Sequence, residues 1–115
     1  MATKLKDVVE RLGLEVWTHG EKGDLEVTGG YAGDLLSDVL ANSEPGDLWV
    51  TVQVHPNIVG VAAIKDLTAI ILVNGRRYQE ETIKKAQEQG IVLASTSLST
   101  FEVVGRLYKM LKDEG

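Results

Sequence analysis

The amino-acid sequence predicts an α/β fold with a largely parallel sheet and helices on its faces. From Leu48 onward the segments alternate between β-rich and helical patterns, three of each. Such alternation implies parallel strands joined by right-handed crossovers. The last two β-rich segments are continuous apolar runs, which is typical of strands buried on both faces. Glycine occurs 12 times and proline twice, as expected for tight turns between regular elements.

Size and composition predict one domain that spans residues 1–115. The 12 basic and 17 acidic residues give a net charge of −5, which argues against a nucleic-acid or membrane-surface partner. The chain has no cysteine, so disulfides, cysteine-held metals and thiol nucleophiles are excluded. No apolar stretch approaches the ~20 residues that cross a bilayer. We therefore expect a cytoplasmic protein without a bound metal or cofactor.

The first half of the chain predicts two helices and two short strands. Thr3 is the predicted N-cap of a helix that ends at Gly13, because apolar residues recur at helical spacing between them, at Leu5, Val8, Val9 and Leu12. Residues Leu14–Thr18 and Leu25–Thr28 have the pattern of strands. Gly29-Gly30 predicts a tight turn. A short helix follows, marked by Leu35, Leu36, Val39 and Leu40.

The second half begins with a predicted strand over Leu48–Val54, which His55-Pro56-Asn57 interrupts. Proline is favoured in the first turn of a helix, so a buried helix is predicted over Asn57–Lys65. A strand over Ala69–Val73 and a charged helix over Glu80–Gln89 follow.

The last predicted strand covers Ile91–Ala94. Ser99 and Glu102 have the spacing of a capping box, which predicts that the final helix begins directly after Ser99. This helix is predicted to bury Val103, Val104, Leu107, Tyr108 and Leu111.

Candidate ligand-binding residues lie in the three turns that follow the predicted strands of the second half. In parallel sheets, ligands bind beyond the carboxyl ends of the strands, where loops meet helix N-termini. The candidates are Gln53, His55, Asn57, Asn74, Gly75, Arg76, Ser95, Thr96 and Thr100. Each has a structural alternative: His55 as a cap, Asn74-Gly75 as a plain turn, the serines as N-caps and Arg76-Arg77 as a solvated pair.

Motifs of known enzymes are absent from the sequence. Neither G-x-G-x-x-G nor G-x-x-x-x-G-K-[ST] occurs, and there is no G-x-S-x-G motif or paired-histidine spacing. The residues thus favour a non-enzymatic role. A small enzyme that uses His55 with Asn57 or Asn74 is a further hypothesis.

Five segments together resemble the DRTGG domain family over about Val27–Leu111. They are Pro45–Thr51, the apolar helix after His55, the strand that ends at Asn74-Gly75, Ser95-Thr96, and Thr100-Phe101-Glu102. The family's naming residues differ here: Val54-His55 stands in place of Asp-Arg, and Val73-Asn74-Gly75 in place of Thr-Gly-Gly.

This resemblance implies a three-layer α/β sandwich like the N-terminal domain of HPr kinase/phosphorylase. It also implies a regulatory or dimerising role, with catalysis located elsewhere. Small free-standing proteins of this kind are similar to products of genes near those of iron-hydrogenase subunits.

The leading hypothesis is therefore a non-catalytic regulatory or interaction module, a homodimer, that senses a small anionic ligand such as a nucleotide or phosphometabolite. The alternative is a protein–protein adaptor for an iron-hydrogenase or other oxidoreductase complex, for which exposure of Trp17, Trp49 and Tyr31 would be evidence.

Overall fold

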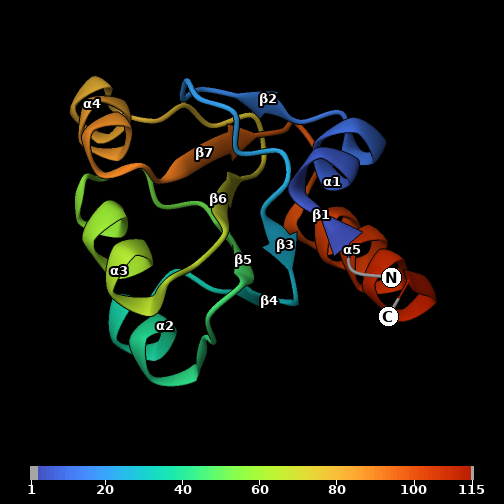
Figure 1. Ribbon diagram of the computed structural model, residues 1–115. Coiled ribbons are helices and arrows are strands. Elements are labelled where there is room, and N and C mark those ends of the chain that lie inside the picture. Colours follow the sequence, from blue (N-terminus) through green and yellow to red (C-terminus); the bar gives the residue numbers. More distant parts are fainter. Residues whose placement is uncertain (1–2, 115) are drawn as a thin grey trace.

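The structure, a computed structural model that describes residues 3–114, is built around a five-stranded sheet (Figure 1). The strand order is β2-β7-β6-β5-β4. Four strands are parallel neighbours, namely β4 (Gly29–Ala32), β5 (Asp47–Thr51), β6 (Ala69–Leu72) and β7 (Val92–Ser95). Strand β2 (Glu15–Val16) joins β7 in the antiparallel direction. A separate two-stranded sheet pairs β1 (Thr3–Lys4) with β3 (Glu26–Val27).

Helices cover both faces of the sheet, which confirms the predicted α/β class (Figure 1). One face carries α1 (Leu5–Leu12) and α5 (Thr100–Glu114). The other carries α2 (Leu36–Asn42), α3 (Asn57–Lys65) and α4 (Glu80–Gln89). Among residues 3–114, no helix is long and apolar enough to cross a membrane.

The central strands divide the apolar side chains between two cores. Along β5, Leu48 and Val50 face α1 and α5, while Trp49 points to the opposite core. All five residues of β5 and all four of β6 are buried. Alternation sends successive side chains to opposite faces, so the middle of a strand covered on both sides is apolar, and the polar residues of β5, Asp47 and Thr51, stand at its two ends. This arrangement explains the continuous apolar runs.

The prediction of a tight turn at Gly29-Gly30 was wrong, because both residues belong to β4. A Cβ atom at Gly29 would lie 2.6 Å from Asp47 Oδ1, and one at Gly30 would lie 3.3 Å from Leu107 Cδ2. Glycine is present here because neighbouring side chains approach the strand closely. A glycine in a sequence can indicate either a tight turn or close packing, so the residue type alone does not distinguish the two.

The predicted cap at Thr3 was also wrong. Thr3 is buried in β1, and Lys4 occupies the N-cap position of α1. The Leu14–Thr18 strand shortens to β2, whose two residues are both exposed at the edge of the sheet. The Leu25–Thr28 strand shortens to β3, which joins β1 rather than the main sheet.

Strand β5 ends at Thr51, three residues earlier than predicted. The Asp34 carboxylate causes the early end, because its Oδ1 accepts hydrogen bonds from Thr51 Oγ1 at 2.8 Å and from Val52 N–H at 2.9 Å. The final helix begins after Ser99 as predicted, and Ser99 Oγ accepts from Glu102 N–H at 3.2 Å. The Glu102 carboxylate instead accepts from Arg106 Nε at 2.9 Å. The helix buries Val103 and Leu107 as predicted, but the prediction that Val104 and Tyr108 are buried was wrong, because both are exposed.

Replacing Gly46 by alanine is expected to destabilise the fold by about 1–3 kcal/mol, the usual cost of a strained backbone. Gly46 has a φ of +88°, and a Cβ there would lie 2.3 Å from Thr28 Oγ1. The matched control is Gly60→Ala in α3, where the new Cβ would meet no atom within 4 Å apart from the chain neighbours and the backbone of its own helix. Alanine favours helix, so this variant should gain about 0.5–1 kcal/mol. Urea unfolding measures the stability of both variants. A Gly46→Ala protein as stable as the wild type would contradict this account of the turn.

Candidate functional site

The carboxyl ends of the parallel strands meet at one edge of the sheet, and the loops after β6 and β7 are joined there. Asn74 N–H donates to Leu98 C=O at 2.9 Å, and Gly75 N–H donates to Thr96 C=O at 3.0 Å. Asn74 and Gly75 have φ angles of +63° and +68°, the left-handed conformation that these two residue types tolerate best. The Asn74-Gly75 turn therefore holds the two loops side by side.

A polar groove, here called the Arg76 groove, lies where these loops meet β2 and encloses about 310 Å³. It contains four of the predicted ligand residues: Gly75, Arg76, Ser95 and Thr96. Five further residues complete its lining: Gly13, Glu15, Trp17, Arg77 and Ser97. The ligand role of the four candidates stays a prediction, but the fold brings them to one place.

Trp17 connects the groove to the strand beneath it. Its indole Nε1 donates a hydrogen bond of 2.7 Å to Ser95 Oγ at the end of β7. The Arg77 guanidinium lies over the indole ring, 5.5 Å from its centroid. A cation at this distance is attracted by the negative face of the ring. Arg77 is therefore held above Trp17 as well as exposed to solvent.

The groove offers several groups that bind anions. Arg76 and Arg77 bring two guanidinium groups, which bind phosphate and carboxylate oxygens in pairs. Within the described chain, the backbone N–H groups of Arg77 and Ser97 have no hydrogen-bond acceptor. The Glu15 carboxylate also lines the groove and offsets part of the positive charge. Two arginines against one glutamate leave the groove with a net positive charge. This charge and the free N–H groups together favour the binding of a small anion.

Tyr78 fixes the loop that carries both arginines. Its side chain is buried, and its hydroxyl donates to Ala94 C=O at 2.7 Å and lies 3.2 Å from Ile70 C=O. Burial raises the pKa of the Tyr78 hydroxyl well above its usual value, so the hydroxyl stays protonated and keeps donating. The phenol thus joins β6 and β7 at the start of the segment that leads from the groove to α4.

The other predicted residues lie outside the groove. Gln53 Nε2 donates to Asp34 C=O at 3.0 Å. His55 Nδ1 accepts from Asn57 N–H at 3.2 Å, a local contact directly before α3, whose N-cap residue is Pro56. Asn74 forms the turn, and Thr100 begins α5. The fold therefore does not bring the loop after β5 to the lining of the Arg76 groove.

The position where the DRTGG family has Asp-Arg has a structural role here. The Val54 carbonyl accepts from Thr82 Oγ1 at 2.6 Å, which ties the loop after β5 to α4. His55 is exposed and interacts with the backbone of Asn57. Among the described residues, no three His, Asp or Glu side chains are grouped so that they could hold a metal ion.

Residues from the N-terminal part of the groove escaped the sequence analysis. Gly13, Glu15 and Trp17 reach it only because β2 pairs antiparallel with β7, with Glu15 opposite Ser95. These partners are 80 positions apart, and no local pattern predicts such a pairing. Arg77 was visible as a charged residue after the turn, but its contact with Trp17 was not.

The fold and the groove together define a class: a layered α/β domain whose strand-end loops form a polar, cationic groove. No family model matches the sequence, and no curated protein matches it. Among solved structures, the chain is similar to the CBS and DRTGG domains of the regulatory region of Clostridium perfringens pyrophosphatase, solved with the activator diadenosine tetraphosphate. The TM-score is 0.68 at 16% sequence identity.

This similarity covers 88% of the present chain and 44% of the pyrophosphatase chain, so the protein spans less than half of the structure that it matches. At this identity the similarity concerns the fold. It confirms, at that level, the resemblance to the DRTGG domain that the sequence predicted.

Tyr78→Phe should lower the free energy of unfolding by about 1 kcal/mol, because a buried carbonyl loses its donor. Tyr108→Phe is the matched control, since the Tyr108 side chain is exposed on α5 and should tolerate the change without loss. Denaturant unfolding of both variants measures the difference. Equal stability of the two variants would show that the Tyr78 hydroxyl does not hold β6 and β7 together.

Proposed function

We propose that the protein is a regulatory module, without catalysis of its own, that binds a small anionic ligand in the Arg76 groove. The ligand class is a nucleotide. One observation carries this proposal: two arginines and an indole converge on the carboxyl ends of two parallel strands. Arginine binds phosphate, and a tryptophan ring offers a flat face for a base.

The structural relative supports the same ligand class. The pyrophosphatase regulatory region is described in complex with diadenosine tetraphosphate, which combines bases with a chain of phosphates. In the present chain, the phosphates would be bound by Arg76 and by the free N–H of Ser97. The base would stack on Trp17, where it replaces Arg77, and Arg77 would turn to the phosphates.

The alternative hypothesis is an adaptor with iron-hydrogenase subunits as partners. It would be favoured by exposed aromatic side chains at Trp17, Trp49 and Tyr31, and none of the three is fully exposed. Trp49 is fully buried and donates from Nε1 to Gly33 C=O at 2.8 Å. Tyr31 and Trp17 are half-buried, and the Tyr31 hydroxyl donates to the Asp38 carboxylate. These aromatic side chains are engaged within the fold. Sensing of an anion is therefore the function that the groove supports better.

Arg76→Ala should weaken nucleotide binding by roughly tenfold to a hundredfold, the range for losing a charged hydrogen-bond donor. Isothermal titration with adenosine mono-, di- and triphosphate, diadenosine tetraphosphate and inorganic phosphate measures the affinities. Arg106→Ala is the matched control, because Arg106 is an exposed arginine on α5 that pairs with Glu102 outside the groove. Absence of binding by every probe at millimolar concentration would refute the proposal.

Nucleotide binding should also change the fluorescence of Trp17. The chain has two tryptophans, and Trp49 is fully buried, so a base that enters the groove reaches Trp17 alone. Stacking should quench part of the emission, and the quenching should disappear in Trp17→Phe. Quenching that persists in Trp17→Phe would place the ligand elsewhere in the molecule.

A further inference from the structure

Glu15 is an acidic residue in a groove whose other charged side chains are basic. Among the described residues that line the Arg76 groove, it alone carries a carboxylate. Its side chain is exposed, and within residues 3–114 it forms no ion pair with Arg76 or Arg77 and accepts no hydrogen bond. A free carboxylate beside a phosphate repels it, unless the same ligand donates hydrogen bonds to the carboxylate. Glu15 therefore favours an anion that also carries hydrogen-bond donors.

The pairing of β2 with β7 sets the order of groups along the groove. Glu15 lies opposite Ser95, and the pairing continues to Trp17, whose N–H donates to Leu93 C=O. The two-residue period of a strand places Trp17 on the same face as Glu15, about 7 Å further along. Because β7 runs in the opposite direction, Ser97 follows Ser95 on the side away from Trp17. Glu15 thus lies between the Trp17 indole and the free N–H of Ser97.

A nucleotide has its groups in the same order, with the sugar between the base and the phosphates. With the base on Trp17 and a phosphate at Ser97, the sugar lies beside Glu15. Ribose carries hydroxyl groups that donate hydrogen bonds, and carboxylates accept them in other nucleotide-binding sites. The register of two strands therefore brings a hydrogen-bond acceptor to the place where a ribose has donors.

Ser95 adds a donor beside this acceptor. Its Oγ accepts the hydrogen bond from Trp17 Nε1, and in the part of the chain that the structure describes its own proton has no acceptor. A hydroxyl group both donates and accepts hydrogen bonds. Glu15 as acceptor and Ser95 as donor together match one hydroxyl of the sugar.

We propose that Glu15 is a specificity-determining residue that selects ribonucleotides, because its carboxylate accepts a hydrogen bond from a ribose hydroxyl. This inference rests on the proposed nucleotide function and adds the sugar to the parts of the ligand that the groove recognises. The structural alternative is a solvated charge that protects the open edge of β2 from pairing with other strands. Such a charge would repel every anion and would not distinguish one sugar from another.

The wild type should bind adenosine triphosphate roughly tenfold or more tightly than its 2′-deoxy or its 3′-deoxy analogue, as for loss of a hydrogen bond to a charged group. Glu15→Ala should bind the ribonucleotide and both analogues with equal affinity. The same variant should bind inorganic tripolyphosphate more tightly than the wild type does, because one repelling charge is gone. Isothermal titration of each ligand at one fixed ionic strength measures these affinities.

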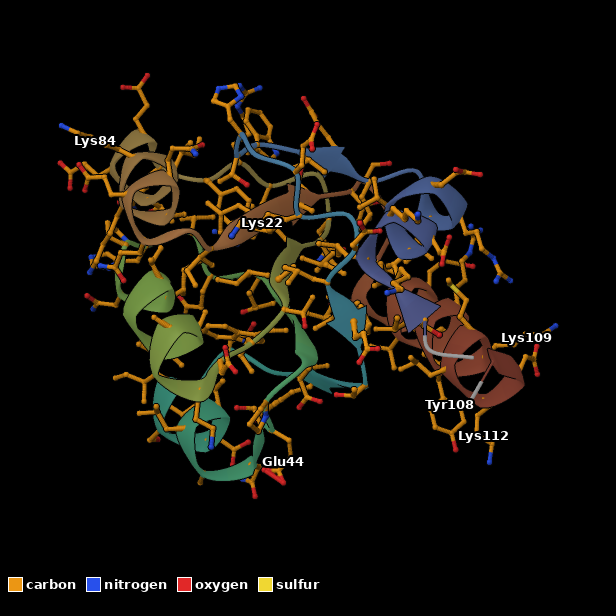
Figure 2. The ribbon with its side chains drawn as sticks, viewed as in Figure 1. Lys22, Glu44, Lys84, Tyr108, Lys109 and Lys112 are labelled. Atoms are coloured by element: carbon orange, nitrogen blue, oxygen red, sulfur yellow. The ribbon has the colours of Figure 1, made fainter. Side chains whose placement is uncertain are left out.

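Glu44→Ala is the matched control. Glu44 is an exposed glutamate in the loop before β5, at the amino ends of the parallel strands. Figure 2 shows Glu44 beside the end of α2, on the other side of the molecule from β2. This variant should keep the preference for ribose and the tripolyphosphate affinity of the wild type. Circular dichroism checks that both variants are folded.

The possible failures differ from each other. Equal affinity of the wild type for the ribonucleotide and both deoxy analogues would overturn the role of Glu15 and leave nucleotide binding in place. A preference for ribose that persists in Glu15→Ala would overturn it as well. If neither nucleotide nor tripolyphosphate binds at millimolar concentration, the proposed function fails and this inference fails with it.

Discussion

Burial of β5, β6 and β7 on both faces is the constraint on which the rest of the structure depends. The middle of each of these strands is therefore apolar, and the polar residues Asp47 and Thr51 of β5 and Ser95 of β7 stand at strand ends. The polar and charged residues are therefore displaced to the strand ends, where loops such as Gly75–Arg77 and Ser95–Ser97 leave the core. The Arg76 groove lies at that boundary, supported from below by the buried hydroxyl of Tyr78.

The sequence predicted the part of the fold that local patterns encode. Continuous apolar runs identified β6 and β7, and Ser99 marked the start of α5 correctly. The N-terminal part was predicted less well, because its elements depend on distant partners. Thr3 forms a strand only because Glu26–Val27 lies beside it, and Glu15 is a strand residue only because it pairs with β7.

The same distinction applies to the candidate site. Gly75, Arg76, Ser95 and Thr96 could be selected because ligands bind beyond the ends of parallel strands, a rule that needs only the order of elements. His55 and Gln53 satisfied the rule equally well, and the structure places them outside the groove, where Gln53 contacts Asp34 and His55 contacts Asn57. Trp17 could not be selected, because the pairing that brings it to Ser95 leaves no mark in the local sequence.

The central claim, that the Arg76 groove binds a nucleotide, is tested most directly by nuclear magnetic resonance of the labelled chain during titration with a nucleotide. The account predicts that the largest amide shifts fall at residues 75–77 and 96–97, together with the indole N–H of Trp17. Shifts confined to residues 53–57, or no shifts at millimolar nucleotide, would contradict it.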